Sequence, residues 1–347
     1  MSAYLRPVVV VDFEYEVSGG DYGLASGDLP RPLCMVAYVL DEHLQHVRTV
    51  RQWRGEFGAT PPFDIGEDAL IVGYSLQAEL TCFQVLGWKF PRHVFDLHTA
   101  YLAASNILEP YEPDEPRKRP SKRLPDACRA YGIEGWEHID KRAMAQDIGE
   151  GRWRIYGREA VLDYCEEDVR KSALLFERQL RGGPGLPPAN VDLGLHWSNY
   201  SAKTVAQIQT RGMPIDTPLW GLVQENKSAI IRNLLRRFDP SHGSDDPIYN
   251  EDGEWAYERF ERHLVRAGIA AWPRLPSGRL NIDGDAFRLM YHAPGIESLH
   301  ALKDSLGVVR RDNLPIGRDG RNRPSLFPFC TQWRHLPRAG EALRADE

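Results

Sequence analysis

The stretch Val8-Val9-Val10-Val11-Asp12-Phe13-Glu14 places two carboxylates at the end of an apolar run. A continuous apolar run predicts a strand that is buried on both faces of a sheet. Because side chains alternate along a strand, Asp12 and Glu14 should point to the same side. Two unpaired carboxylates are costly to bury together, since like charges resist shared ionisation. A hard divalent cation would remove that cost, so we expect further oxygen ligands elsewhere in the chain.

Composition is that of a soluble globular protein of 347 residues, which suggests two domains and a sizeable core. The formal net charge of -6 gives no global basic field, which is weak evidence against nucleic-acid binding. Five dispersed cysteines form no C-x-x-C pair, and this pattern favours reduced thiols in a cytoplasmic protein. We expect no membrane segment, because no apolar run has the length needed to span a membrane, and no signal peptide, because the N-terminus lacks the profile of one.

The first half of the chain alternates predicted strands and helices. The predicted strands are residues 5–12, 33–40, 44–52, 69–73 and 94–96, and the predicted helices are residues 76–86, 124–131, 139–148 and 158–181. Asp96 is expected to cap a helix that follows it. This order predicts an α/β or α+β domain with a central mixed sheet.

The run Gly182-Gly183-Pro184-Gly185-Leu186-Pro187-Pro188 has the composition of a linker. We therefore expect one domain over residues 1–183 and a mainly helical region over residues 184–347. The predicted helices of the second region are residues 201–210, 219–238, 257–267, 284–291 and 296–306.

Two further segments offer acidic side chains to the same site as Asp12 and Glu14. Glu79 lies at the start of a predicted helix, after a short strand. Tyr164 and Asp168 are four residues apart in a long predicted helix and so share one face of it. Four carboxylates and a tyrosine suit two Mg²⁺ or Mn²⁺ ions. Such a pair can generate hydroxide and stabilise the attacking and leaving oxygens of a phosphodiester.

Taken in this order, the three segments resemble the exonuclease motifs of the DEDD superfamily. The Tyr-x-x-x-Asp form of the third motif resembles the tyrosine subgroup (DEDDy), which includes the proofreading domain of family A DNA polymerases and ribonuclease D. The resemblance implies a ribonuclease-H-like fold and 3′→5′ exonuclease activity that releases nucleoside 5′-monophosphates from DNA. It also implies that Asp12, Glu14, Glu79 and Asp168 hold two metal ions and that Tyr164 orients the attacking water.

The second motif departs from the pattern of the subgroup. It usually reads Asn-x-x-x-Phe/Tyr-Asp, whereas this chain has Tyr74, Ala78 and Glu79 at the corresponding positions. Glutamate keeps the charge and adds a methylene, which displaces the carboxylate at a site where small displacements matter. Tyr74 replaces an amide that would contact the nucleic-acid strand.

The resemblance continues beyond the linker. Residues 206–216 are similar to the helix and turn that precede the polymerase region of family A enzymes, and residues 314–323 resemble a segment just before the Thr-Gly-Arg element there. Thr331-Gln332-Trp333 stands where that element would be expected. The resemblance thus implies an incomplete polymerase portion, and we expect no polymerase activity.

Residues of three kinds are candidates for nucleic-acid binding. Arg119, Lys122 and Arg123 belong to a basic cluster that could clamp phosphates or could be a solvated loop. Phe13 could stack a base, since it lies between two metal carboxylates. Tyr74 and Lys141 are further candidates because the resemblance places residues that lie near the nucleic acid at these two positions. Lys141 could equally be a solvated charge.

The acidic residues of the expected metal site also have less specific interpretations. Asp12 and Glu14 could face solvent at a strand end, and Glu79 could simply complement the helix dipole. Two other functions also fit the sequence, namely an RNA-trimming exonuclease of the ribonuclease D type and a non-catalytic nucleic-acid-binding remnant.

Overall fold

The computed structural model describes residues 7–17, 27–106, 123–135, 141–250, 252–310 and 314–323. Its contacts divide the chain into two compact units. The first unit comprises the described residues of Met1–Pro214 and Pro315–Glu347, and the second is Ile215–Leu314. The sequence analysis predicted domains over residues 1–183 and 184–347. That these two parts fold as independent domains stays a prediction.

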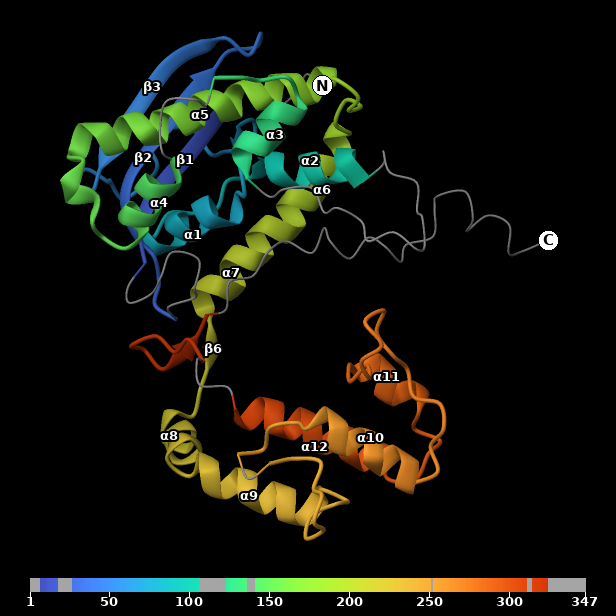
Figure 1. Cartoon of the computed structure of the whole chain (residues 1–347). Coiled ribbons are helices and arrows are strands. Elements are labelled where there is room, and N and C mark those ends of the chain that lie inside the picture. The colour runs from blue at the N-terminus through green and yellow to red at the C-terminus, as the bar shows by residue number, and fades with distance from the viewer. Residues whose placement is uncertain are drawn as a thin grey trace. The chain divides into compact units, whose positions relative to one another are not determined.

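The first unit is built on a five-stranded mixed sheet (Figure 1). Its strands are β1 (Val8–Glu16), β2 (Arg31–Leu40), β3 (His46–Trp53), β4 (Leu70–Gly73) and β5 (His93–Asp96), in the order β3-β2-β1-β4-β5. The β1–β2 and β2–β3 pairs are antiparallel, whereas the β1–β4 and β4–β5 pairs are parallel. The α/β class and the central mixed sheet are therefore confirmed.

Strand β1 runs further than its apolar composition predicts. The expected strand over residues 5–12 is in fact Val8–Glu16, because pairing with β2 continues as far as Glu16 opposite Arg31. A register shift between Glu14 and Tyr15 interrupts the ladder near this end. Asp12 and Glu14 thus lie inside the strand, just before the irregularity, rather than at its end.

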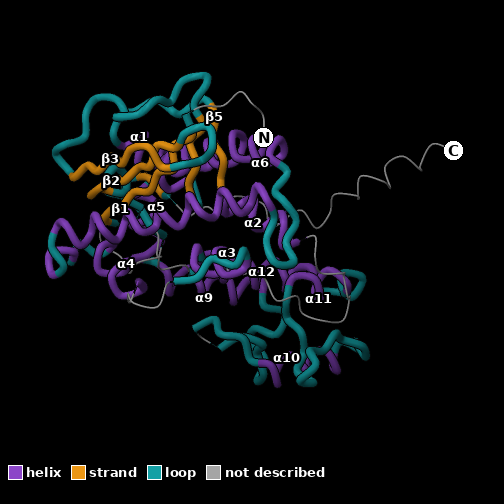
Figure 2. The backbone as a smooth tube through the Cα atoms, turned by 90° about the horizontal axis from the view of Figure 1, so that it is seen from above, coloured by secondary structure: helices purple, strands orange, loops and turns teal. Residues whose placement is uncertain are grey.

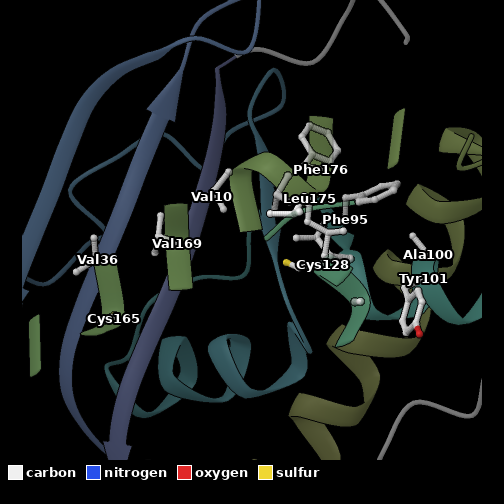
Figure 3. Close-up of a cluster of buried hydrophobic side chains, with 14 of the residues drawn as sticks. Val10, Val36, Phe95, Ala100, Tyr101, Cys128, Cys165, Val169, Leu175 and Phe176 are labelled. Carbon is white, nitrogen blue, oxygen red and sulfur yellow. The ribbon is translucent and has the colours of Figure 1, made fainter. Parts of the chain in front are cut away.

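Helices cover both faces of this sheet (Figure 2). They are α1 (Gln77–Val85), α2 (Leu97–Asn106), α3 (Leu124–Ala130), α4 (Lys141–Gly149) and α5 (Arg158–Arg181), with a short 3₁₀ turn at Trp153–Ile155. Successive valines of β1 enter different cores, as the alternation of a strand requires. Val8 and Val10 join the cluster that contains α5, whereas Val9 and Val11 join the cluster that contains α1. Figure 3 shows Val10 and Val36 of the sheet in the same cluster as Val169 of α5.

Two more helices complete the first unit, and the second of them packs against α1. They are α6 (Val191–Trp197) and α7 (Lys203–Arg211), joined by a π-helical turn at Ser198–Ala202. Ala202 and Ala206 pack in the same cluster as Leu80 and Phe83 of α1. Helix α7 therefore supports the helix that carries Glu79, although it follows the expected linker in sequence.

The chain leaves the first unit and later returns to it through a small two-stranded sheet. Strand β6 (Met213–Pro214) pairs with β7 (Arg321–Asn322) in antiparallel fashion. Arg323 follows β7 and is only 8% exposed. Its guanidinium donates to the backbone oxygens of Gly27 (2.7 Å) and Thr210 (3.2 Å), which fixes the returning segment on the first unit.

The second unit is helical, as expected. Its helices are α8 (Thr217–Glu225), α9 (Lys227–Phe238), α10 (Tyr257–Arg266), α11 (Gly284–Leu289) and α12 (Ile296–Val309). The single helix expected over residues 219–238 is wrong, because Asn226 separates α8 from α9. The Asn226 side chain donates to the backbone oxygen of Leu222 (2.9 Å), which offers the chain a local alternative to continued helix.

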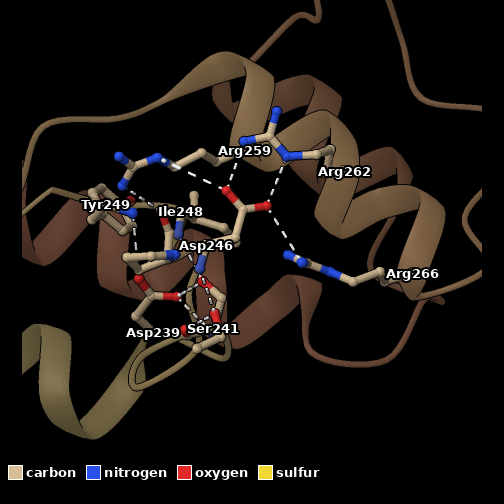
Figure 4. Close-up of polar contacts among 10 residues, drawn as sticks. Asp239, Ser241, Asp246, Ile248, Tyr249, Arg259, Arg262 and Arg266 are labelled. Atoms are coloured by element: carbon tan, nitrogen blue, oxygen red, sulfur yellow. Dashed lines mark hydrogen bonds and ion pairs between the residues drawn. The ribbon is translucent and has the colours of Figure 1, made fainter.

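Polar contacts close the loop between α9 and α10 (Figure 4). Asp246 accepts from Arg262 at 2.6 and 2.8 Å, and Arg266 lies 3.4 Å from the same carboxylate. Asp239 accepts from the hydroxyl of Ser241, which in turn accepts from the backbone amide of Ile248. These bonds hold the loop against α10 in place of regular secondary structure.

None of the helices among the described residues has the length and apolar character needed to cross a membrane.

Candidate metal centre

Strand β1 presents Asp12 and Glu14 on one side of the sheet, as the strand period requires. They follow Val8 and Val10 on the face that packs against α5. One carboxylate oxygen of each residue lies within 4.8 Å of the other and of the Cys165 sulfur. The prediction that Asp12 and Glu14 point to the same side of the sheet is therefore confirmed.

Glu79 reaches the same region because α1 begins where β4 stops. Strand β4 pairs with β1 only from Val8 to Val10, so Phe13 lies beyond its end. The backbone amide of Phe13 instead donates a hydrogen bond to the Glu79 carboxylate. Glu79 is 3% exposed. Its burial argues against the alternative in which it merely complements the helix dipole from a solvated position.

Gly73 allows this close approach. A Cβ at Gly73 would lie 2.6 Å from Cδ1 of Leu76, 3.1 Å from the backbone oxygen of Val11 and 3.5 Å from Cγ of Glu79. The turn that follows is fixed by Asp96, whose carboxylate accepts from the backbone amide of Ser75 (3.0 Å). Asp96 also accepts from the backbone amide of His98 at the start of α2, so its expected capping role is confirmed.

Helix α5 supplies Tyr164, Cys165 and Asp168. Asp168 is partly exposed and interacts electrostatically with both Glu14 and Glu79. Tyr164 is 7% exposed and packs in the core between α5 and the sheet. The charge of Asp168 therefore acts on Glu14 and Glu79, although among the described residues only Asp12, Glu14 and Cys165 form a group of three whose ligand atoms lie within 4.8 Å of one another. Most of the Tyr164 side chain is buried.

The electrostatics of the cluster follow from its composition. Burial raises the pKa of Glu14 well above its usual value, and the negative charges of Asp12, Asp168 and Glu79 raise it further. Burial likewise raises the pKa of Glu79, and Asp12, Asp96 and Asp168 add to the effect. Four carboxylates from β1, α1 and α5 thus lie close enough to oppose one another's ionisation.

A divalent cation fits the donor set. Oε2 of Glu79 is buried and has no hydrogen-bond partner among the described residues. A buried carboxylate oxygen without a partner is costly unless something positive satisfies it. Carboxylate oxygens are the ligands that Mg²⁺ and Mn²⁺ prefer.

Cysteine residues form a part of this region that the sequence analysis missed. The Cys165 thiol donates to the backbone oxygen and to Oδ2 of Asp12, both at 3.4 Å. It also forms a hydrogen bond with Cys34 of β2. A signal was present, because Cys165 and Asp168 are three residues apart and so share a helix face. The four described cysteines are free thiols.

The residues expected to bind nucleic acid have different surroundings. Phe13 is 3% exposed and packs against Phe83 and Trp88, so its ring is part of the core rather than a stacking surface. Tyr74 is partly buried beside His98, with ring centroids 5.3 Å apart. Burial raises the pKa of Tyr74 well above its usual value.

Of the basic candidates, only Arg123 has a described side chain. It is exposed and forms an ion pair with Asp126 at 3.0 Å. Arg119 and Lys122 lie outside the described residues, and so does the side chain of Lys141 at the start of α4. Their contacts with nucleic acid stay predictions.

The chain is similar to a solved structure of a DNA polymerase domain. No family model matches the chain. No curated protein matches it either. The structure is the POL domain of Pol1 from M. smegmatis in complex with DNA primer-template and dNTP, with 14% identity and a TM-score of 0.45. The match covers 96% of this chain and 53% of that one, so this chain spans about half the length of that structure. At this identity and score, the match identifies neither a family nor an activity.

Proposed function

We propose that this chain is a metal-dependent 3′→5′ exonuclease that hydrolyses terminal phosphodiesters of DNA to nucleoside 5′-monophosphates. One observation carries the proposal. Asp12, Glu14, Glu79 and Asp168 come from three separate sequence motifs, and the charges of Asp12 and Asp168 raise the pKa values of both Glu14 and Glu79, while oxygens of Asp12 and Glu14 lie within 4.8 Å of each other. We further propose that the mixed sheet is of the ribonuclease-H-like type that the sequence resemblance implies.

The four carboxylates would hold two Mg²⁺ or Mn²⁺ ions. Bound in this way, the ions would supply a nucleophile at neutral pH and stabilise the charge on the attacking and leaving oxygens. Glu79 fits this role because one of its oxygens accepts from the Phe13 amide and the other is left without a partner among the described residues. Gly73 leaves room for the longer side chain of glutamate, since a Cβ at that position would lie 3.5 Å from Cγ of Glu79.

The remaining side chains would orient the substrate. The Tyr164 hydroxyl would hold the attacking water by a hydrogen bond, and its buried ring would keep the hydroxyl in place. Tyr74, Phe13, Arg119, Lys122, Arg123 and Lys141 are retained as proposed contacts of the nucleic acid. For Phe13, a contact through the backbone suits its buried ring better than base stacking.

A nuclease assay with an end-labelled strand tests the proposal. The full chain is incubated with a single-stranded DNA labelled at its 5′ end, in Mn²⁺ or in EDTA. We expect a ladder that shortens from the 3′ end, with nucleoside 5′-monophosphate as the product and no cleavage in EDTA. Asp168→Asn should abolish the ladder, whereas Asp285→Asn, on the exposed surface of the second unit, should not.

The same assay separates the alternatives. Faster cleavage of an RNA strand would favour an RNA-trimming enzyme of the ribonuclease D type. A strand that is bound but stays intact in Mg²⁺ and in Mn²⁺ would favour a non-catalytic binding protein and overturn the proposal.

A further inference from the structure

Cys165 brings a sulfur atom into the candidate metal centre. Its side chain is fully buried, at 0% exposure, and its thiol donates to Oδ2 of Asp12 at 3.4 Å. One oxygen of Asp12, one oxygen of Glu14 and the Cys165 sulfur all lie within 4.8 Å of one another. These three atoms form a potential ligand set that differs from one built of carboxylates alone.

The spacing suits a tetrahedral cation with one sulfur ligand. Zn–S bonds are about 2.3 Å and Zn–O bonds about 2.0–2.2 Å, so neighbouring ligand atoms of a tetrahedral ion lie roughly 3.3–3.7 Å apart. The Cys165 sulfur lies 3.4 Å from Oδ2 of Asp12, which has this spacing already, and a Glu14 oxygen lies within 4.8 Å of the other two ligand atoms. Three protein ligands also leave a fourth position open, as in catalytic zinc sites.

Glu79 gives an independent sign of an ion at this place. It comes from a different element, α1, and is 3% exposed. Its Oε2 has no hydrogen-bond partner among the described residues, and the negative charge of Asp12 raises the pKa of this carboxyl group. An unsatisfied buried anion next to the ligand set is what a bound cation would stabilise.

We propose that Cys165, as a thiolate, joins Asp12 and Glu14 in a mixed sulfur–oxygen site that binds Zn²⁺ more tightly than Mg²⁺. Thiolate ligands favour Zn²⁺, whereas carboxylates alone suit Mg²⁺ and Mn²⁺. On binding, the sulfur–metal bond forms, the S–H bond breaks and the proton passes to solvent. The inference rests on the proposed function in taking Asp12 and Glu14 as cation ligands. In an exonuclease with this site, Zn²⁺ would displace the ions that support hydrolysis.

Cobalt(II) is the probe, because a thiolate bound to Co²⁺ gives a charge-transfer absorption band and a carboxylate does not. The reduced full chain is titrated with Co²⁺ alone, and Zn²⁺ is then added in competition. We expect the band in the parent protein and its loss on adding Zn²⁺. In Cys165→Ala the band should be absent and the apparent Zn²⁺ affinity at least about tenfold weaker, given that even outer-shell changes cost 10–100-fold.

Cys128→Ala is the matched control, since Cys128 is also fully buried in the first unit but lies on α3. It should keep both the band and the affinity. Asp12→Asn should remove the band, which would place the thiolate and the carboxylate on the same ion. If Cys165→Ala does not fold by circular dichroism, Cys165→Ser serves instead, because a hydroxyl of similar size gives no thiolate band.

A band that persists in the Cys165 variant, or no band in the parent, would overturn the inference. These outcomes are separate from those of the nuclease assay. A thiolate band without nuclease activity would support the sulfur–oxygen site and contradict the proposed exonuclease. Nuclease activity without the band would support the exonuclease and contradict the sulfur–oxygen site.

Discussion

The Glu79 carboxylate accepts a hydrogen bond from the backbone amide of Phe13, the residue between Asp12 and Glu14. The bond joins the first turn of α1 to β1 beyond the end of β4. It therefore fixes the distance between the carboxylates of the two elements. Glu79, which departs from the sequence motif, is thus held by the strand that carries Asp12 and Glu14.

Glu79→Gln separates the charge of this side chain from its hydrogen bond. The amide oxygen can still accept from Phe13, so α1 should keep its position. We expect the stability of the metal-free protein to be equal or higher, because one of several opposed buried charges is removed. We expect Mn²⁺-dependent cleavage to fall at least 10–100-fold, the range found for outer-shell changes at metal sites.

Thermal unfolding in EDTA and nuclease rates in Mn²⁺ provide the two measurements. Glu79→Ala is the comparison, since it removes the hydrogen bond as well as the charge and should lower stability. If Glu79→Gln has the same nuclease rate as the parent protein, Glu79 is not part of the metal centre.

Gly73→Ala should disturb the same junction by steric means. Its Cβ would meet Leu76 at 2.6 Å and the backbone oxygen of Val11 at 3.1 Å. Overpacking of this kind costs about 1–3 kcal/mol. We expect a lower urea midpoint together with weaker Mn²⁺ binding. Gly58→Ala is the control, because its Cβ would meet only Thr60, at 3.6 Å or more. Equal midpoints for the two variants would contradict the proposed tight contact.

Tyr164→Phe should lower the nuclease rate without loss of metal binding. The ring is 7% exposed and packs in the core, so phenylalanine should preserve the fold. Loss of a group that only orients water should reduce the rate constant by about tenfold to a hundredfold. The rate at saturating substrate and the Mn²⁺ affinity by calorimetry test this split. An unchanged rate would show that the hydroxyl has no part in the reaction.

Asp246→Asn should destabilise the second unit in a pH-dependent way. Hydrogen bonds from Arg262 lower the pKa of Asp246, and the charges of Arg262, Arg266 and Arg259 lower it further. Because the folded-state pKa lies below the unfolded one, the stabilisation is present above the unfolded pKa and is lost as the pH falls through the folded pKa. The variant should therefore be less stable than the parent at neutral pH and equally stable in strong acid.

Hydrogen exchange of peptides from α10 measures this effect within the second unit. Asp285→Asn is the control, since its pair with Arg288 lies on an exposed helix surface where such pairs contribute little. Faster exchange in the Asp246 variant at all pH values alike would point to lost packing rather than lost charge.

The regular elements of the first unit were largely predictable from local pattern. Helix α5 has the predicted bounds of residues 158–181, because its apolar period is long and a glycine with positive φ flanks each end. The positions of Asp12, Glu14 and Asp168 followed from the strand and helix periods. In each case the deciding information lies within a few residues of the sequence.

Features that depend on tertiary contacts were not predictable. Helix α6 contains Gly194, which lowers helix propensity, yet the absence of a side chain is required there because a Cβ would lie 2.5 Å from the ring of Phe95. The contact of Cys165 with Asp12 depends on how α5 packs on β1. The return of the chain at Arg323 depends on partners more than a hundred residues away.

The most direct test of the candidate metal centre is a crystal of the full chain soaked with Mn²⁺ and a nucleoside 5′-monophosphate, with anomalous diffraction recorded. The account predicts two manganese peaks among the carboxylates of Asp12, Glu14, Glu79 and Asp168, with the phosphate of the nucleotide beside them. An ordered site that shows no anomalous peak among these four carboxylates would contradict it.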